Sequence, residues 1–274
     1  MAEKLSVALE QNKPNYSKSD LKIVAYVNAH MDTVMYDSLT EIAEKCSVGE
    51  ATVLRFCRKL GYQGYQDFKL AAAMEIKPAI IASEHDGNLI NRVYSAMQKS
   101  LEESYQLLDK VGVQQAVKWL GEYEDIVILG VGHSGISALD FQSRLLRVGK
   151  KAESVTDSHF QVMRASLATE QTLVIALSIS GSTKDIVDAV ARAKAKGAKV
   201  LAITSYLKSP LTKLSDLVIM SNGKEGPLEG GAMSGKVSQL LIVDVLCTGY
   251  ALENGEMTKK VKQDAAIAVS QKIY

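Results

Sequence analysis

Two short segments of this 274-residue chain are rich in glycine and hydroxyl side chains, a composition suited to binding an anion. The first is Gly130-Val-Gly-His-Ser-Gly135 and the second is Ser178-Ile-Ser-Gly-Ser-Thr183. Glycine lets backbone N–H groups close on an anion, and serine or threonine hydroxyls add hydrogen bonds. Neither segment contains an acidic residue. One such segment is explained by capping and turn formation alone, but two on neighbouring strands predict a shared phosphate site.

A second chemical feature is the basic stretch at residues 50–60. At helical spacing, one face carries Val53, Phe56, Cys57 and Leu60, and another carries Thr52, Arg55 and Lys59 with Arg58 beside them. Arginine pairs with guanine edges, while lysine and threonine hold phosphates or bases. Periodicity by itself also fits an ordinary amphipathic helix with a solvated charged face. The preceding residues favour the DNA-reading alternative.

Those preceding residues have helix-turn-helix spacing. A helix is expected from about Leu39, capped by Ser38 or Thr40, with the small Ala43 where two helices approach and Gly49 just before the basic helix. We therefore predict DNA contacts from one set of side chains in the turn and the basic helix: Ser47, Glu50, Thr52, Arg55, Arg58 and Lys59. Two further helices are expected, one after the N-cap residues 17–20 and one over 65–73.

The glycine-rich segments are positioned by an alternation of apolar runs and helical patterns that starts at Asp125. The apolar runs are 126–130, 152–156, 172–177, 199–204 and 217–220, and the intervening stretches have helical periodicity. Continuous apolar strands separated by helices predict a parallel sheet covered on both faces. The fold class is therefore an all-α helix-turn-helix domain followed by an α/β domain with a five-stranded, doubly wound, flavodoxin-like sheet. Its ligand crevice is expected beyond the carboxyl ends of the strands.

Composition sets limits on function. The net charge is only +1, and residues 1–77 hold ten basic and ten acidic side chains, so DNA-binding charge must be concentrated locally. No apolar run is long enough to span a bilayer, and residues 1–15 lack the apolar core of a signal peptide. Three scattered cysteines form no metal-binding pattern. We expect a cytoplasmic protein without a metal site or cofactor.

Both halves resemble one family. The segments Leu39-Thr-Glu-Ile-Ala43, Glu50 to Gly61 and Gly64-Tyr-Gln-Asp-Phe-Lys69 resemble the helix-turn-helix domain of RpiR-type bacterial regulators. The two glycine-rich segments, Ile203-Thr-Ser205 and the stretch from Ser234 to Asp244 resemble a SIS (sugar isomerase) domain. The resemblance implies a DNA-binding transcriptional regulator, expected to be a repressor of sugar-metabolism genes, whose effector is a sugar phosphate.

The resemblance also implies site residues. Side chains matching Ser134, Ser178, Ser180 and Thr183 surround the sugar phosphate in SIS domains, helped by the backbone of Ile179 and Ser182. The further members of the predicted site are Gly132, His133, His159, Glu229 and Lys236. Lys236 stands in Ser-Gly-Lys where many relatives have Ser-x-Arg, so it keeps the charge but loses the bidentate fork. His159 is equally explained as a solvent-exposed turn residue.

Two enzyme alternatives remain open at this stage. A SIS-type sugar-phosphate isomerase would need a general base, for which Glu229 is available, and a proton carrier such as His133 or His159. An isomerase needs no DNA-reading helix, so regulation is favoured and no catalytic residue is assigned. The first segment also matches the dinucleotide fingerprint G-x-G-x-x-G, with Glu153 and Asp157 near the expected acid. A five-stranded sheet and a serine-rich second loop argue against an NAD-dependent oxidoreductase.

The expected organisation follows from these patterns. It comprises a helix-turn-helix domain at 1–77, a helical linker at 78–108, a SIS domain at 109–251 and a helical tail at 252–274. The linker could act as a hinge or pack against the C-terminal domain. Two DNA-binding domains are needed to contact the two half-sites of a palindrome. We therefore expect a homodimer or homotetramer that binds a palindromic double-stranded operator. We expect no association with a membrane.

Overall fold

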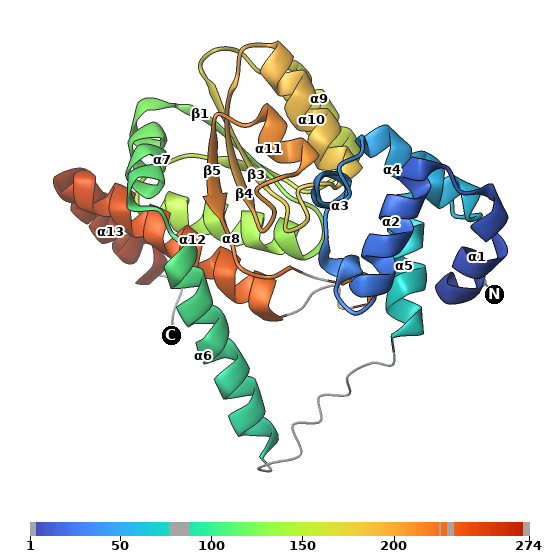
Figure 1. Ribbon diagram of the computed structural model, residues 1–274. Coiled ribbons are helices and arrows are strands. Elements are labelled where there is room, and N and C mark those ends of the chain that lie inside the picture. The colour runs from blue at the N-terminus through green and yellow to red at the C-terminus, as the bar shows by residue number, and fades with distance from the viewer. Residues whose placement is uncertain (1–3, 77–87, 225, 229–232, 271–274) are drawn as a thin grey trace. The chain divides into compact units, whose positions relative to one another are not determined.

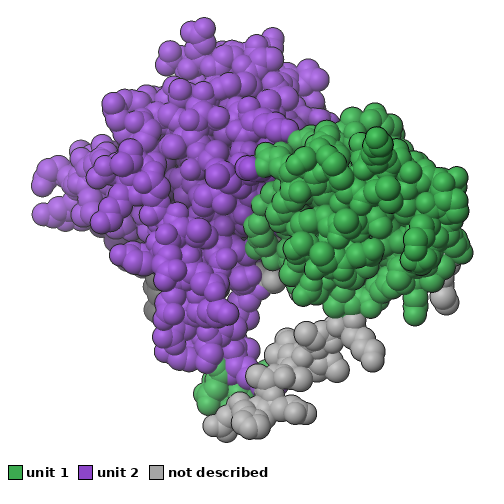
Figure 2. Space-filling model, in the orientation of Figure 1, with its two compact units in different colours: residues 1–91, 224–232 green, residues 92–223, 233–274 purple. Residues whose placement is uncertain are grey.

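The computed structural model describes residues 4–76, 88–224, 226–228 and 233–270. The chain divides into two compact units (Figure 2). Unit 1 comprises Met1–Asn91 with Lys224–Ala232, and unit 2 comprises Arg92–Gly223 with Met233–Tyr274. Each unit has a hydrophobic core of its own.

Unit 1 is built from short helices. They are α1 (Leu5–Gln11), α2 (Lys18–Ala29), α3 (Leu39–Lys45), α4 (Glu50–Lys59) and α5 (Tyr65–Glu75), with 3-10 turns at Lys13–Asn15 and Val34–Tyr36. The sequence patterns predicted α2 to α5 but not α1. Helix α1 has only seven residues and its N-cap, Lys4, makes no side-chain capping bond, so no local signal marks it. Packing of Leu5, Ala8 and Leu9 into the core explains why it is helical.

The helix starts in unit 1 follow from capping chemistry. Ser17 and Ser38 each accept a hydrogen bond from the backbone N–H three residues on, and the acid at that position, Asp20 or Glu41, accepts from the capping residue's own N–H. Such reciprocal capping boxes satisfy donors that the first helical turn leaves unpaired. The expected N-cap at 17–20 is thus confirmed, and Ser38 rather than Thr40 caps α3.

Unit 2 contains five parallel strands and their connecting helices (Figure 1). The strands are β1 (Asp125–Leu129), β2 (Glu153–Val155), β3 (Thr172–Leu177), β4 (Lys199–Thr204) and β5 (Leu217–Met220). The helices are α6 (Leu89–Leu107, whose first residues belong to unit 1), α7 (Lys110–Glu122), α8 (Gly132–Arg147), α9 (Ser158–Ser166), α10 (Lys184–Ala195), α11 (Pro210–Leu214), α12 (Met233–Glu253) and α13 (Gly255–Ser270). The strand order β2-β1-β3-β4-β5 confirms the doubly wound, flavodoxin-like sheet.

The sheet of unit 2 is covered on both faces, as Figure 1 shows. One core cluster joins alternate strand residues such as Ile128 and Ile175 to α7, α8 and α12. The other joins the intervening residues, such as Val127 and Val174, to α9, α10 and α11. Alternate burial on two faces explains why strands β3 and β4 read as unbroken apolar runs.

Helices α6 and α7, which precede the first strand, add detail to the predicted domain organisation. Ser100 and Ser104 of α6 are buried, and the Ser100 hydroxyl donates to the Ser234 carbonyl oxygen at 3.0 Å. Helix α6 thus packs within unit 2, which favours the second of the two alternatives for the linker; residues 78–87 lie outside the described part of the chain. Helix α7 was not separately predicted; its N-cap Asp109 accepts from two backbone N–H groups.

Helix α12 is, among the described residues, long and apolar enough by composition to cross a membrane. Half of its most apolar window is buried inside the protein, and Val243 and Leu246 lie in the core beneath the sheet. These contacts are those of a core helix.

Candidate functional sites

The two glycine-rich loops follow strands β1 and β3, which are neighbours in the sheet. Leu129 of β1 is in register with Ala176 of β3, so the loops that begin a few residues later leave the same edge side by side. The chain order reverses here, because β2 lies on one side of β1 and β3 on the other. Such a switch point is where doubly wound sheets open a ligand crevice.

Carbonyl oxygens of the loop after β3 are occupied by hydrogen bonds within unit 2. The Ile179 oxygen accepts from Ser205 N–H at 3.0 Å and from the Thr204 hydroxyl at 3.1 Å, and the Gly181 oxygen accepts from Leu211 N–H at 3.0 Å. In the described part of the chain, the backbone N–H groups of Ile179, Ser180 and Thr183 have no hydrogen-bond partner. A loop with satisfied acceptors and free donors is a cradle for an anion.

The hydroxyl groups of this loop complete the cradle. Ser178 is buried, and its oxygen lies 3.3 Å from that of Thr183, the N-cap of α10. The Ser180 hydroxyl accepts from Ser182 N–H at 3.2 Å. Gly181 makes the turn possible: its φ is +59°, and a Cβ there would lie 2.2 Å from the Ser209 hydroxyl oxygen. Only glycine fits at this position.

The loop after β1 begins α8 at Gly132, so Ser134 lies in the first helical turn. Ser134 is buried, whereas Gly132 and His133 are exposed. Gly130 packs tightly under this turn, because a Cβ there would lie 2.5 Å from the Ser134 carbonyl oxygen. The predicted residues Ser134, Ser178, Ser180 and Thr183 therefore all lie on the two loops at the β1–β3 edge.

The remaining predicted residues of this site are distributed as follows. His133 and Lys236 line a cleft of about 300 Å³ with Ile136, Ser137, Asp140 and Leu240, between α8 and α12. His159 is exposed in the first turn of α9, where its backbone N–H donates to the N-cap Asp157 at 2.9 Å. Glu229 lies outside the described residues. A separate groove of about 770 Å³ between α8, α12 and α13 contains none of the predicted residues.

In unit 1, α3 and α4 form the predicted helix-turn-helix. The buried face of α4 holds Val53, Phe56 and Cys57, as predicted, and Gly49 is its N-cap. The turn itself has a feature that the sequence did not suggest: its left-handed residue is Ser47, with φ +52°, and not a glycine. The Val48 N–H then returns to the Ala43 carbonyl oxygen at 2.9 Å, which closes the turn against α3.

The polar side chains of α4 differ in whether they contact neighbouring segments of unit 1. Arg55 and Arg58 are exposed, and Arg55 lies 3.1 Å from the Thr52 hydroxyl. Lys59, which we predicted as a DNA contact, is also exposed, and it places its amino group 2.5 Å from Asp20 Oδ2 and 3.2 Å from the Asn15 carbonyl oxygen. Glu50 accepts from the Thr40 hydroxyl at 2.6 Å. Lys59 and Glu50 thus join α4 to its neighbours.

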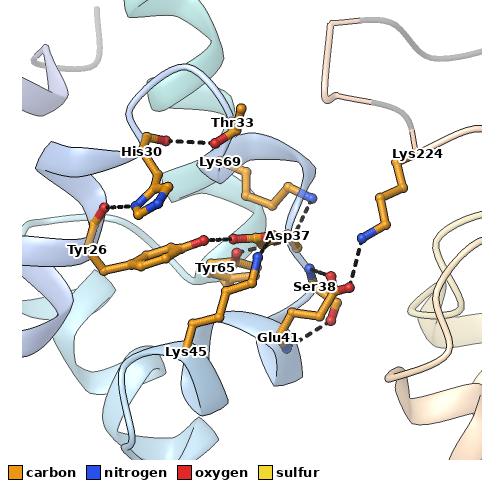
Figure 3. Close-up of polar contacts among 10 residues, drawn as sticks. All are labelled: Tyr26, His30, Thr33, Asp37, Ser38, Glu41, Lys45, Tyr65, Lys69 and Lys224. Atoms are coloured by element: carbon orange, nitrogen blue, oxygen red, sulfur yellow. Dashed lines mark hydrogen bonds and ion pairs between the residues drawn. The ribbon is translucent and has the colours of Figure 1, made fainter.

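A polar network around Asp37 joins side chains of α2, α3 and α5 (Figure 3). The Asp37 carboxylate accepts from the Tyr26 hydroxyl and from Lys45, each at 2.6 Å. Its backbone carbonyl accepts from the Tyr65 hydroxyl at 3.1 Å and from buried Lys69 at 3.0 Å. Burial opposes the charge of Lys45, but the ion pair with Asp37 outweighs it and raises the Lys45 pKa. For Lys69 burial dominates and lowers the pKa to about 8.

Glu41, the residue that closes the capping box of α3, has a second contact in unit 1. Its carboxylate binds the Ser38 N–H at 2.7 Å through one oxygen and the Lys224 ammonium at 2.8 Å through the other. Partial burial would raise the pKa of Glu41, but these two donors lower it overall. The carboxylate therefore stays charged and holds the first turn of α3.

Sequence reasoning missed three buried polar residues that hold these sites. They are Asp37, Gln161 and Gln239. The Gln161 amide donates to the carbonyl oxygens of Gly130 at 3.1 Å and Val155 at 2.8 Å, which ties β1 to β2 beside the first loop. The Gln239 amide donates to the Ser134 hydroxyl at 3.0 Å. The only sequence signal for Gln239 is a polar Ser-Gln pair inside the apolar helix α12.

Comparison with known proteins covers both units. Residues 3–79 match the model of the helix-turn-helix domain of the rpiR family, and residues 121–249 match the SIS domain. An HTH-type transcriptional regulator of Clostridium perfringens is 32% identical over 94% of this chain and 97% of its own. The HTH-type transcriptional regulator RpiR of Escherichia coli is 26% identical over 92% of this chain and 88% of its own.

Two solved structures are also similar. The Vibrio vulnificus NanR protein complexed with ManNAc-6P superposes with a TM-score of 0.91 at 32% identity, covering 97% of this chain and 98% of NanR. The sugar isomerase domain of an RpiR transcription factor from Sphaerobacter thermophilus gives a TM-score of 0.59 at 19% identity over 65% of this chain and 98% of that chain, which shows the shared fold. The chain thus belongs to the RpiR family: it is a helix-turn-helix transcriptional regulator with a C-terminal SIS domain.

Proposed function

We propose that this regulator responds to a phosphorylated N-acetylated amino sugar of the ManNAc-6P class, bound at the β1–β3 edge of unit 2. The observation that carries the proposal is the cradle of free N–H groups at Ile179, Ser180 and Thr183 beside Ser134. Free donors with no acidic side chain suit a phosphate dianion. The likeness to NanR, which was solved with ManNAc-6P, supports the choice of sugar.

In this proposal the phosphate and the sugar contact different parts of the site. The phosphate binds Ser134, Ser178, Ser180 and Thr183 with the backbone of Ile179 and Ser182. The sugar extends from Gly132 toward the cleft that His133 and Lys236 line. Glu229 and His159 are assigned to the sugar end on the family resemblance.

Calorimetry on the full chain tests the effector assignment. ManNAc-6P should bind more tightly than fructose 6-phosphate, and unphosphorylated ManNAc should not bind measurably. The double change Ser180→Ala, Thr183→Ala should weaken ManNAc-6P binding at least tenfold, because it removes two hydroxyl donors to a charged group. Ser166→Ala is the matched control, because its hydroxyl bonds the Val162 carbonyl within α9. Unchanged affinity in the double variant would refute the loop assignment.

For the second ligand we propose a palindromic operator, read in the major groove by α4. Arg55 and Arg58 are exposed cations on this helix without an ion pair among the described residues, and Thr52 lies beside Arg55. Ser47 and Glu50 lie at the entry to the helix, and Lys59 acts mainly by holding α4 to Asp20. Two DNA-binding domains are required to occupy the two half-sites of a palindromic operator. The exposed Ile136, Leu139 and Leu146 on α8 support a homodimer or homotetramer.

A mobility-shift titration tests the DNA assignment. Arg55→Ala with Arg58→Ala should weaken operator binding by at least about 30-fold, since a base-reading contact contributes about 1–3 kcal/mol. The double variant Lys99→Ala, Lys118→Ala in unit 2 removes the same charge and should leave binding unchanged. Wild-type affinity should fall steeply with salt. Equal loss in both double variants would show that only overall charge matters.

The two proposed ligands together suggest the biological role of the protein. We propose a cytoplasmic repressor of sugar-metabolism genes whose operator affinity changes when the sugar phosphate binds. A ligand shifts such an equilibrium only through different affinity for the two states. Repeating the mobility-shift titration with saturating ManNAc-6P measures that coupling, and an unchanged operator affinity would contradict it.

A further inference from the structure

Gln239 is a buried polar residue whose place in α12 is not explained by packing. Its side chain is fully buried, and its neighbours Val237, Ile242 and Val243 are also buried. The Gln239 Nε2 donates to the Ser134 hydroxyl at 3.0 Å, but Oε1 has no hydrogen-bond partner among the described residues. Leaving a buried acceptor unpaired lowers stability. An apolar side chain of the same size would avoid that cost, so the amide has another role.

The contact with Gln239 fixes what the Ser134 hydroxyl can offer. A serine hydroxyl has one proton to donate and two lone pairs to accept with. The amide group of Gln239 only donates, so Ser134 must use a lone pair for it. No other hydrogen bond involves the Ser134 side chain in the described part of the chain. Its proton therefore stays free for a different partner that accepts.

The position of Ser134 indicates which partner that is. Ser134 lies in the first turn of α8, directly beyond β1, and the loop after the neighbouring strand β3 carries the free N–H groups of Ile179, Ser180 and Thr183. The free backbone groups of this loop are then all donors, and the Ser134 hydroxyl can add another. A phosphate dianion has only acceptor oxygens and can use every one of these donors, whereas a monoanion or an alcohol presents a proton of its own to them.

We propose that Gln239 is a positioning residue that fixes the Ser134 hydroxyl as a donor and thereby makes the site selective for a phosphate dianion. This inference rests on the proposed effector site, because Gln239 acts only through Ser134. The buried amide achieves this without touching the ligand. The sugar end of the effector is recognised elsewhere and is not affected.

A double-mutant cycle on the full chain tests the role of Gln239. ManNAc-6P affinity is measured for wild type, Gln239→Met, Ser134→Ala and the double variant. Gln239→Met should weaken binding about three- to tenfold when Ser134 is present and less than twofold when Ser134 is alanine. A purely structural role for Gln239 predicts the same loss in both backgrounds, and that result would overturn the proposal.

A pH profile gives a readout that a loss of stability does not change. The second pKa of a phosphomonoester is about 6, so wild-type affinity should fall about tenfold between pH 7.5 and pH 5. Gln239→Glu keeps the shape but accepts from Ser134, which turns the hydroxyl's lone pairs toward the ligand. Its affinity should be at least tenfold weaker at pH 7.5, with a flatter profile. The other titratable side chains near the proposed site, His133, Asp140, His159 and Lys236, are present in wild type and in all variants and so do not distinguish them.

The outcomes separate this inference from the proposed function. If wild type binds neither ManNAc-6P nor inorganic phosphate, the effector site itself is wrong and the inference fails with it. If wild type binds and Gln239→Met matches its affinity and pH profile, only the role of Gln239 is wrong. If Gln239→Glu does not fold, as the fluorescence of Trp119 in unit 2 would report, the Gln239→Met cycle still decides.

Discussion

The buried amine of Lys69 makes the stability of unit 1 depend on pH in a direction opposite to that of most lysines. Lys69 is 6% exposed, and its ammonium group donates to the Asp37 carbonyl oxygen at 3.0 Å. Burial lowers its pKa to about 8, although the charges of Asp37 and Glu41 partly oppose this. In the unfolded chain the pKa is about 10.4. The replacement Lys69→Met removes the titrating group and keeps a side chain of similar length.

The magnitude follows from the two pKa values. Below about pH 8 the folded protein must hold a buried charge that the unfolded chain keeps in water, and above about pH 10.4 the amine is neutral in both states. The difference of roughly 2.4 pKa units, at about 1.4 kcal/mol each, amounts to about 3 kcal/mol. The free energy of unfolding of wild type minus that of Lys69→Met should therefore rise by about 3 kcal/mol between pH 7.5 and 10.5.

Subtracting the free energy of unfolding of Lys69→Met from that of wild type separates the contribution of Lys69 from those of the other titrating groups. Burial raises the pKa of Cys57 to about 12 and also raises that of Tyr26, with help from Asp37. These groups keep protons that the unfolded chain loses, so each lowers the stability of both proteins as pH rises above about 9. That loss cancels in the difference. At pH 7 the variant should be the more stable protein by about 2 kcal/mol, since it loses only a hydrogen bond worth about 1 kcal/mol.

The assay is urea unfolding at several pH values, in which hydrogen exchange in helices α2 to α5 reports the unfolding of unit 1. Trp119, the single tryptophan, lies in unit 2, so its fluorescence is an internal control that should not respond to the replacement. A difference that stays flat between pH 8 and 10.5, or that falls, would refute the reasoning. It would mean that Lys69 is solvated in the folded protein.

Three further predictions concern backbone geometry and capping. Ser47→Gly should raise the stability of unit 1 by about 0.5–1 kcal/mol, since a left-handed conformation costs an L-residue roughly 1–2 kcal/mol and glycine recovers part of it; no gain in urea unfolding would contradict this. Gly181→Ala should destabilise unit 2 by at least about 2 kcal/mol and abolish ManNAc-6P binding, because the new methyl group would overlap the Ser209 hydroxyl; wild-type calorimetry would count against it. Asp20→Asn should cost unit 1 about 1–2 kcal/mol at pH 7 by weakening the cap and the Lys59 pair. Burial opposes the charge of Asp20, but these partners lower its pKa below that of the unfolded chain. The cost should therefore begin to shrink once pH falls below about 4 and continue to shrink as pH falls through the lowered pKa, and a cost that does not change with pH below about 4 would contradict the ion-pair argument.

Local chemistry explains why much of the fold was predictable. Strands β1, β3 and β4 are apolar runs buried on both faces, and each run is short and bounded by polar or glycine residues. The caps at Ser17 and Ser38 satisfy donors three residues away, so their signal is contained within four residues. The position of the two glycine-rich loops was predictable for the same reason, because strand, glycine-rich loop and helix N-terminus are contiguous in the chain. Helix α1 lacks such a signal, and it was missed.

Contacts between distant segments could not be predicted in this way. The exposed face of α4 predicted Lys59 as a DNA contact, but it gave no sign that the Lys59 ammonium group also pairs with Asp20, 39 residues earlier. The loop after β1 suggested that Ser134 binds phosphate, but only the fold shows that Gln239, 105 residues later, donates a hydrogen bond to its hydroxyl. Periodicity and capping act over one or two turns and are written in the sequence. The partner of a buried polar group is decided by which helices pack together, and that is settled only when the whole core forms.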